Sequence, residues 1–330
     1  MRSDPINRRA FVVGVAGATI GGSRISLAQT SKLYRLGGLV PGPPLSATAG
    51  NGAVLIKSLE QRGYVLGQNL VFDSRGGESQ AALVERMQEL KASNVDAVVT
   101  VGYPPSVIAK ASGAPTVIAF GSGDPVATHL VDGLARPGGN VTGISDNATT
   151  LSTKRLSLLK EVKPGLRRVA MIWNKDDLGM SLRYEASAMA ANAIDVSVQP
   201  FGMREATDFN DAFKTMAENL PDAILVVADS LTFLNRKRIF DFAVTNRIPA
   251  IYEYAGAVRE GGLMSYGPDV PESFERAANL IDRIFKGARP ADLPFEQPTR
   301  YLFVLNLKTA KTMSFTVPNT ALALADEVIE

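Results

Sequence analysis

The chain has 330 residues, of which 45% are hydrophobic, and it contains no cysteine. This length favours two domains with buried cores, and the lack of cysteine excludes disulfides, thiolate metal sites and a cysteine nucleophile. The net charge is +2, and removing the four arginines and one aspartate of residues 1–28 leaves 31 basic and 32 acidic residues. Binding to a nucleic-acid backbone needs a basic face, so we expect no nucleic-acid partner.

Residues 1–28 have the pattern of an export signal. The basic pair Arg8-Arg9 precedes a short apolar run, and Ser26-Leu27-Ala28 places small residues before a cleavage point at Gln29. The apolar run is too short to span a bilayer, which takes about 20 residues. The segment around Arg8-Arg9 resembles a twin-arginine signal, although Asn7 and Val13 depart from that pattern. We therefore predict export, with the twin-arginine and general secretory routes both open.

From residue 33 onward, short apolar runs alternate with amphipathic stretches. The first half has expected strands at 33–40, 70–74, 97–101 and 116–120 and expected helices at 53–63 and 82–90. After a glycine-rich stretch the alternation restarts, with expected strands at 169–173, 196–200, 223–227 and 250–252 and expected helices at 151–162, 182–193, 209–220 and 234–245. Continuous apolar strands between helices predict parallel sheets covered on both faces, and hence two α/β lobes.

The pattern changes after residue 262. A strand at 263–266, a helix at 274–285, a strand at 301–305 and a last helix from Leu307 follow the two sheets. The economical arrangement has the chain cross back to the first lobe near residue 266 and return near residue 298. The predicted fold is α/β, with two doubly wound open-sheet lobes joined by a three-crossing hinge. Lobe 1 is expected to contain residues 29–145 and 267–298, and lobe 2 residues 146–266 and 299–330.

Several segments carry a resemblance to a known family. They are Gly123-Asp124-Pro125-Val126 and residues 135–143, 248–254, 261–267 and 286–294. With these segments the chain resembles the ABC-transporter substrate-binding proteins of the type I periplasmic-binding fold, in the subgroup similar to tryptophan- and tyrosine-binding proteins. The resemblance implies periplasmic capture of a small organic ligand, such as an amino acid or aromatic acid, and delivery to an ABC permease. It also implies a monomer that has no enzymatic activity and no cofactor.

Ligands of open parallel sheets bind beyond the carboxyl ends of the strands, so the loops at those ends supply the candidate residues. The twelve candidates are Pro43, Leu45, Tyr103, Gly121, Ser122, Trp173, Asn174, Asp229, Ser230, Tyr252, Tyr254 and Tyr266. Glycine amides and serine hydroxyls suit a ligand carboxylate, an aspartate suits an ammonium group, and tyrosine rings suit an apolar or aromatic body.

Some candidates have an alternative interpretation that the sequence leaves open. Gly121 can serve only to turn the chain, Asp229 can be only a helix N-cap, and Trp173 can be core packing. In an extended segment Tyr252 and Tyr254 point the same way, so we expect one of them to face the ligand and the residue between them to point away.

Two other functional classes share this fold, so the site must decide between them. The chain has a single histidine, His129, and neither a Gly-x-Ser-x-Gly elbow nor a phosphate loop is present. We therefore expect no catalytic residue and no metal site. A transcription regulator needs an N-terminal DNA-binding module, where this chain has its export signal. A receptor module that serves a sensor protein stays open beside transport. The expected mechanism is hinge closure around the ligand.

Overall fold

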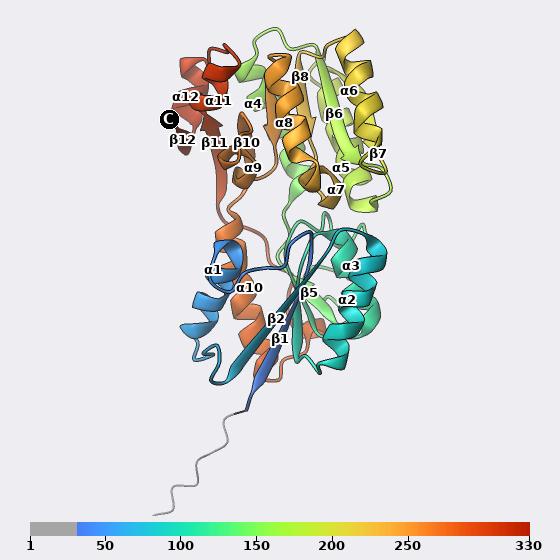
Figure 1. Cartoon of the computed structure of the whole chain (residues 1–330), viewed down its shortest axis with the longest axis vertical. Coiled ribbons are helices and arrows are strands. Elements are labelled where there is room, and N and C mark those ends of the chain that lie inside the picture. Colours follow the sequence, from blue (N-terminus) through green and yellow to red (C-terminus); the bar gives the residue numbers. More distant parts are fainter. Residues whose placement is uncertain (1–31) are drawn as a thin grey trace, which may run out of the picture. The chain divides into compact units, whose positions relative to one another are not determined.

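The computed structural model describes residues 32–330, apart from the side chains of residues 148 and 149 (Figure 1). The predicted export signal lies outside the described residues. Residues 33–330 form one compact unit. In this part of the chain, no helix has the length and apolar character needed to cross a membrane.

The first lobe is built on a five-stranded parallel sheet with the strand order β2-β1-β3-β4-β5. Its strands are β1 (Tyr34–Pro41), β2 (Leu70–Gly77), β3 (Ala97–Val101), β4 (Thr116–Phe120) and β5 (Val141–Gly143). Its helices are α1 (Gly50–Glu60), α2 (Gln80–Ala92), α3 (Tyr103–Ser112) and α10 (Val270–Phe285). Leu36 packs with α1 and α10, whereas Leu39 packs with α2 and α3. Odd spacing along a strand puts these two leucines on opposite faces, so both faces are buried.

The second lobe is built on a seven-stranded sheet with the order β12-β11-β10-β9-β8-β6-β7. Its strands are β6 (Arg168–Asn174), β7 (Ser197–Met203), β8 (Ala223–Val226), β9 (Ala250–Tyr252), β10 (Met264–Pro268), β11 (Tyr301–Asn306) and β12 (Glu327–Ile329). All neighbours are parallel except β10 and β11.

Helices cover both faces of this second sheet. They are α4 (Ala148–Val162), α5 (Leu178–Asn192), α6 (Asp208–Glu218), α7 (Ser230–Leu234), α8 (Arg236–Thr245), α9 (Ala255–Arg259), α11 (Leu307–Thr312) and α12 (Asn319–Leu324). Along β6, Met171 and Trp173 belong to the core under α4 and α5, whereas Ala170 and Ile172 belong to the core under α6 and α8. The near-continuous apolar run in β6 is therefore what a doubly covered strand requires.

The chain passes between the two sheets three times, as Figure 1 lets the reader follow. The first passage, residues 144–147, pairs with the third, because Ser145 N–H donates to the Glu296 carbonyl at 2.8 Å. The second passage follows β10, and Asp269 N–H donates to the Arg300 carbonyl of the third at 3.0 Å. The predicted α/β class with two sheet lobes is confirmed. The residue boundaries of the lobes stay a prediction, since residues 33–330 form a single unit by contacts.

Several elements differ from the sequence-based expectation. The expected last helix from Leu307 is two short helices, α11 and α12, followed by the strand β12. Three other differences lie in segments that contain glycine or proline. No helix was expected directly after the strand at 97–101, but Tyr103 begins α3, because proline fits the first turn of a helix, where its missing N–H is not needed. The glycine-rich stretch contains the short strand β5, which pairs with β4. A further short helix, α9, follows β9. These segments are short and rich in glycine or proline, so they lack the periodicity that predicts an element.

Candidate functional site

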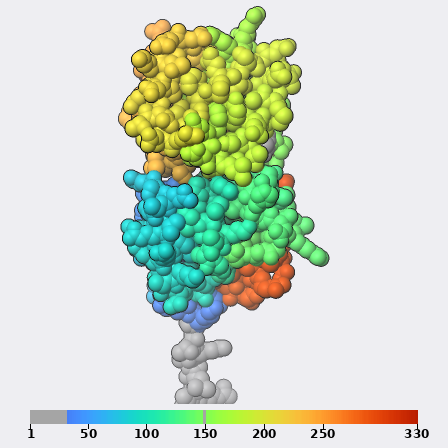
Figure 2. Space-filling model, turned by 90° about the vertical axis from the view of Figure 1, so that its right-hand side faces the viewer, coloured from blue at the N-terminus to red at the C-terminus, as the bar shows by residue number. Residues whose placement is uncertain are grey.

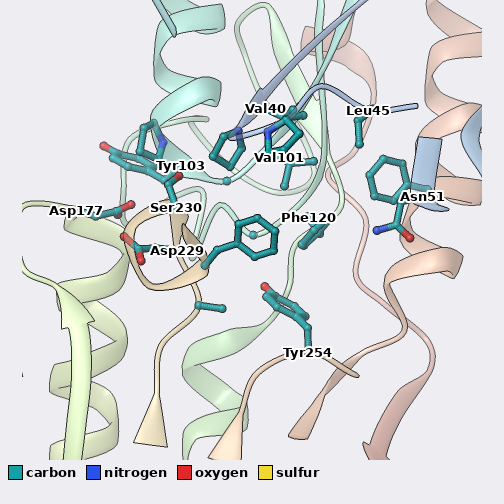
Figure 3. Close-up of a pocket in the computed structure, with 18 residues that line it drawn as sticks. Val40, Leu45, Asn51, Val101, Tyr103, Phe120, Asp177, Asp229, Ser230 and Tyr254 are labelled. Carbon is teal, nitrogen blue, oxygen red and sulfur yellow. The ribbon is translucent and has the colours of Figure 1, made fainter. Parts of the chain in front are cut away.

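Residues from both lobes line a cavity of about 300 Å³ (Figure 3). The first lobe contributes Val40, Pro41, Pro43, Leu45, Asn51, Val101, Gly102, Tyr103, Pro104, Phe120, Gly121 and Phe274. The second lobe contributes Asp177, Ala228, Asp229, Ser230, Phe233 and Tyr254. Most of these residues follow the carboxyl end of a strand, which is where an open parallel sheet binds ligands. The volume is at the lower end of the range for small-molecule sites.

Seven of the sequence candidates meet at this cavity. They are Pro43, Leu45, Tyr103, Gly121, Asp229, Ser230 and Tyr254. Gly121 follows β4 with a φ of +84°, a conformation that favours glycine, so the turn interpretation and a place in the cavity wall hold together. Asp229 likewise caps α7, since its side chain accepts the Thr232 N–H at 2.7 Å, and it also lines the cavity.

Trp173 and Tyr252 pack in the cores of the second lobe, outside this cavity. The Trp173 ring stacks on Tyr184 with centroids 3.9 Å apart. The Tyr252 ring meets Phe240 edge-on at 5.2 Å. Because β9 ends at Tyr252 and the chain then turns into α9, Tyr254 does not share its face. One tyrosine of this pair faces the cavity, and it is Tyr254.

The remaining three candidates do not line this cavity. Ser122 is fully buried. Asn174 accepts the Asp176 N–H at 3.1 Å in the turn before α5. The Tyr266 ring stacks with Tyr301, and its carbonyl accepts a hydrogen bond from Arg155 at 2.8 Å. Contact of these residues with a ligand stays a prediction.

One end of the cavity is apolar and aromatic. The rings of Phe120 and Tyr254 meet edge-on with centroids 5.2 Å apart, and Phe274 meets Phe120 at 5.7 Å. Leu45 and Phe233 add further apolar surface. Aromatic side chains attract one another in such edge-on arrangements, so this end can take a flat apolar or aromatic group.

The other end of the cavity is acidic. Figure 3 shows the carboxyl groups of Asp177 and Asp229 side by side, close to Tyr103 and Ser230. Asp177 is 4% exposed, and burial together with the charge of Asp229 raises its pKa to about 7. Burial also raises the pKa of Asp229. Among the described residues that line the cavity there is no lysine, arginine or histidine. This end is therefore suited to a cation.

The sequence candidates on β6 end at Asn174, its last residue, and do not include Asp177. The turn after β6 runs on to Asp177, the N-cap of α5, whose Oδ1 accepts the Met180 N–H at 3.2 Å. Its place before a helix was a signal that could have found it, because a cap residue lies at the carboxyl side of the strand. Phe120 was also missed, as the last residue of a strand that reads as core.

A buried network of charges lies directly behind Tyr254. The Tyr254 hydroxyl donates to Asp146 at 2.9 Å, and Asp146 pairs with Arg183. Arg183 also pairs with Glu253, which pairs with Arg155 at 2.8 Å. All four charged side chains are at most 2% exposed. Glu253 is thus held within this network and does not line the first cavity, and the network joins the first passage between lobes to the second lobe.

A second cavity, of about 350 Å³, adjoins the first. The two share Asn51, Phe120, Ala228, Phe233 and Tyr254 as lining residues. The charged side chains that line the second cavity are paired, for example Arg236 with Glu260 and Arg259 with Glu327. The acidic end of the first cavity is consequently the more suitable place for a charged ligand group.

A model of the family described as ABC transporter substrate binding protein matches residues 40–329. The chain belongs to this family. The match covers both lobes and all the residues of the cavity. This substrate-binding family is not enzymatic, so the expectation of a non-enzymatic binding protein is confirmed.

This substrate-binding protein is similar in sequence or in fold to the following proteins. It is 24% identical over 260 residues to a tyrosine-binding protein of Clostridioides difficile, a match covering 78% of this chain and 74% of the relative. A Streptococcus pneumoniae ABC domain solved in complex with L-Trp is 23% identical, with a TM-score of 0.80 over 90% of this chain and 100% of that one. A conserved domain protein of Vibrio cholerae is 22% identical, with a TM-score of 0.82 over 90% of this chain and 100% of that one.

Proposed function

We propose that this substrate-binding protein captures an amino acid with an aromatic side chain and delivers it to the permease of an ABC transporter. The observation that carries the proposal is the polarity of the first cavity. Asp177 and Asp229 stand at one end, and Phe120, Tyr254 and Phe274 stand at the other. An amino acid with an ammonium group and an aromatic ring has this same polarity.

The ligand would lie with its ammonium group between the two carboxyl groups and its ring against the aromatic end. The carboxylate of the ligand, which is attached to the same carbon as the ammonium group, would face the uncharged backbone at Gly121. Backbone amides and side-chain amides bind a carboxylate without adding a charge of their own. The names of the tyrosine-binding relative and of the L-Trp complex support an amino acid of this kind.

Capture would proceed by closure of the two lobes. The acidic end comes from the second lobe, whereas Leu45, Tyr103 and Phe120 come from the first, so a ligand completes its contacts only when the lobes are together. A ligand that binds one conformation better shifts the population toward it. The three passages between the sheets are the segments that would bend.

We place this activity outside the cytoplasm, in the periplasm, with the protein acting as a monomer. Export rests on the sequence pattern of residues 1–28, with its arginine pair and the small residues before Gln29.

A thermal-shift screen of the purified protein tests the proposed ligand class. A ligand at 100 times its dissociation constant adds about 2.7 kcal/mol to the free energy of unfolding and raises the melting temperature. We expect a rise with L-tyrosine or L-tryptophan and none with small sugars. The variant Asp229→Asn should show a smaller rise with the same amino acid. The proposal would be contradicted if none of the common amino acids raised the melting temperature, or if sugars raised it equally.

A further inference from the structure

Three oxygen atoms at the acidic end of the cavity are buried and lack a hydrogen-bond partner within the described part of the chain. They are Asp177 Oδ2, Asp229 Oδ2 and Ser230 Oγ. All three residues line the cavity, and Figure 3 shows them together. Buried polar atoms are almost always paired in folded proteins, so three unpaired acceptors in the wall of one cavity indicate a bound group.

The other carboxylate oxygens are already used by the protein. Asp177 Oδ1 accepts the Met180 N–H, and Asp229 Oδ1 accepts both the N–H and the hydroxyl of Thr232. Each aspartate therefore holds its own helix start with one oxygen and presents the other to the cavity. A group that bonds here has three acceptors to satisfy. A primary ammonium carries three N–H donors, one for each.

We propose that the Asp177–Asp229 pair holds one proton in the ligand-free protein and exchanges it for the primary ammonium group of the ligand. The inference deepens the proposed function and rests on it. In the exchange, an O–H bond of the carboxyl pair breaks and the proton goes to water. N–H···O bonds from the ammonium to Asp177, Asp229 and Ser230 form in its place. The charge of the pair with its bound cation is the same before and after.

The surroundings of the pair support a retained proton. Two carboxyl groups that share a buried site cannot both ionise at low cost. Burial and the charge of Asp229 raise the pKa of Asp177 to about 7, against the opposing charge of Arg183. Arg183 is itself engaged by Asp146 and Glu253, so it offers the pair little compensation.

Two further polar neighbours of the pair, Tyr103 and Asn174, carry no positive charge. On the side of α3, Tyr103 keeps its proton, since burial and the charge of Asp177 raise its pKa. On the side of β6, the neutral Asn174 amide favours the ionised form of Asp229.

The proton and the ammonium compete for the same atoms. Because both Oδ1 atoms accept backbone N–H groups, a proton on the pair must sit on an Oδ2 atom. A protonated Oδ2 is a donor and would face the N–H donors of the ammonium. Binding therefore requires the proton to leave, and ligands without a primary ammonium, such as N-acylated amino acids or plain aromatic acids, should bind poorly.

Calorimetric titration of the full chain with L-tyrosine and L-tryptophan tests the exchange. Below pH 7 the ligand amine stays ionised. In this range we expect the affinity to increase by up to tenfold for each unit by which the pH increases. The rise should flatten above pH 7. At pH 6, titrations in buffers of different ionisation enthalpy should show release of close to one proton per ligand. N-acetyl-L-tyrosine and 3-(4-hydroxyphenyl)propionate should bind at least tenfold more weakly. An affinity that does not change from pH 5 to 8, with no proton released, would overturn the proposal.

Two aspartate variants separate the exchange from a general effect of charge. Asp177→Asn keeps the cap oxygen but removes the proton site, so it should weaken L-tyrosine binding about 10- to 100-fold at pH 8 and abolish the pH dependence. Asp176→Asn is the matched control, because Asp176 is 60% exposed, pairs with Arg204 and does not line the cavity. It should keep both the affinity and its pH dependence.

A titration of the ligand-free chain distinguishes failure of this inference from failure of the proposed function. Carboxyl carbon NMR should show one group titrating near pH 7 that is absent in Asp177→Asn. If no amino acid binds but this titration is present, the proposed ligand class fails and the proton on the pair stands. If all carboxyl groups titrate near pH 4, the inference fails whether or not an amino acid binds.

Discussion

Asp177 uses its two carboxylate oxygens for different tasks. Oδ1 caps α5 through the Met180 N–H, and Oδ2 faces the cavity without a partner among the described residues. A cap contributes about 1 kcal/mol to a helix, and asparagine caps as well as aspartate. The negative charge at this position is consequently not needed for the fold. The charge instead lowers the stability of the folded protein, since burial disfavours the ionised form of Asp177.

Burial of the Asp177 carboxyl group predicts that the free energy of unfolding depends on pH in the absence of ligand. The pKa of Asp177 is raised to about 7, above its ordinary value of 3.8. Between these values the unfolded chain ionises while the folded chain keeps its proton, so the contribution of Asp177 to stability falls as the pH rises from 4 to 7. Asp177→Asn should therefore raise the free energy of unfolding by about 1–4 kcal/mol at pH 8 and leave it unchanged at pH 3.5.

Urea unfolding of the wild type and the variant at the two pH values measures this difference. Asp176→Asn, next to it in the chain but exposed, should change stability by less than about 0.5 kcal/mol at either pH. A variant Asp177→Asn that is equally destabilised at both pH values would show that the carboxyl group has a structural role beyond the cap.

The elements around the cavity are held by the buried charge network. Arg183 of α5 joins Asp146 in the first passage between the lobes to Glu253 after β9, and Arg155 of α4 joins Glu253 to the carbonyl of Tyr266 in β10. The network thus connects α4, α5, β10, the segment after β9 and the first passage next to Tyr254. The hydroxyl of Tyr254 donates to Asp146, so the network also positions a residue of the cavity wall.

Removal of one charged side chain from this network should greatly lower the free energy of unfolding. Arg183→Leu leaves Asp146 and Glu253 as buried carboxylates, and breaking a buried ion pair in this way costs about 3–5 kcal/mol. The matched control is Arg204→Leu, whose pair with Asp176 is exposed and is worth about 0–1 kcal/mol. Chemical unfolding at pH 7 measures both. Equal losses of stability in the two variants would mean that the buried network does not stabilise the fold.

At the scale of the whole molecule, the two lobes meet at the cavity. A Cβ atom on Gly123 of the first lobe would lie 3.2 Å from the Cα of Gly179 in the second, and one on Gly42 would lie 3.2 Å from Leu234. Figure 2 shows the surfaces of the lobes in contact, with the first in blue to green and orange-red and the second in green to orange. Contacts of this kind form only when the lobes approach.

Ligand binding should therefore change the distribution of the molecule between separated and closed lobes. Small-angle X-ray scattering should show a smaller radius of gyration when L-tyrosine or L-tryptophan saturates the protein, because the bound state favours contact between the lobes. A sugar that causes no thermal shift serves as the control and should leave the radius unchanged. An unchanged radius on saturation with an amino acid that raises the melting temperature would contradict closure.

The amino-acid sequence determined the class of fold and much of the cavity wall. Apolar runs such as β6, covered on both faces, and loops that follow the strands at Leu45, Gly121 and Asp229 can be identified from local pattern alone. This is possible because burial dictates residue type along a strand, and the carboxyl ends of parallel strands meet at one edge.

Only the tertiary structure decided which side chains at those strand ends face the ligand cavity. Trp173 stacks on Tyr184 and Tyr252 packs on Phe240, whereas Asp177 reaches the cavity from the start of a helix. These outcomes depend on partners far away in the sequence and on the turn taken after each strand, and a local pattern contains neither. The pairing of Asp177 with Asp229, about fifty residues apart, exists only because the folded lobe places two helix starts side by side.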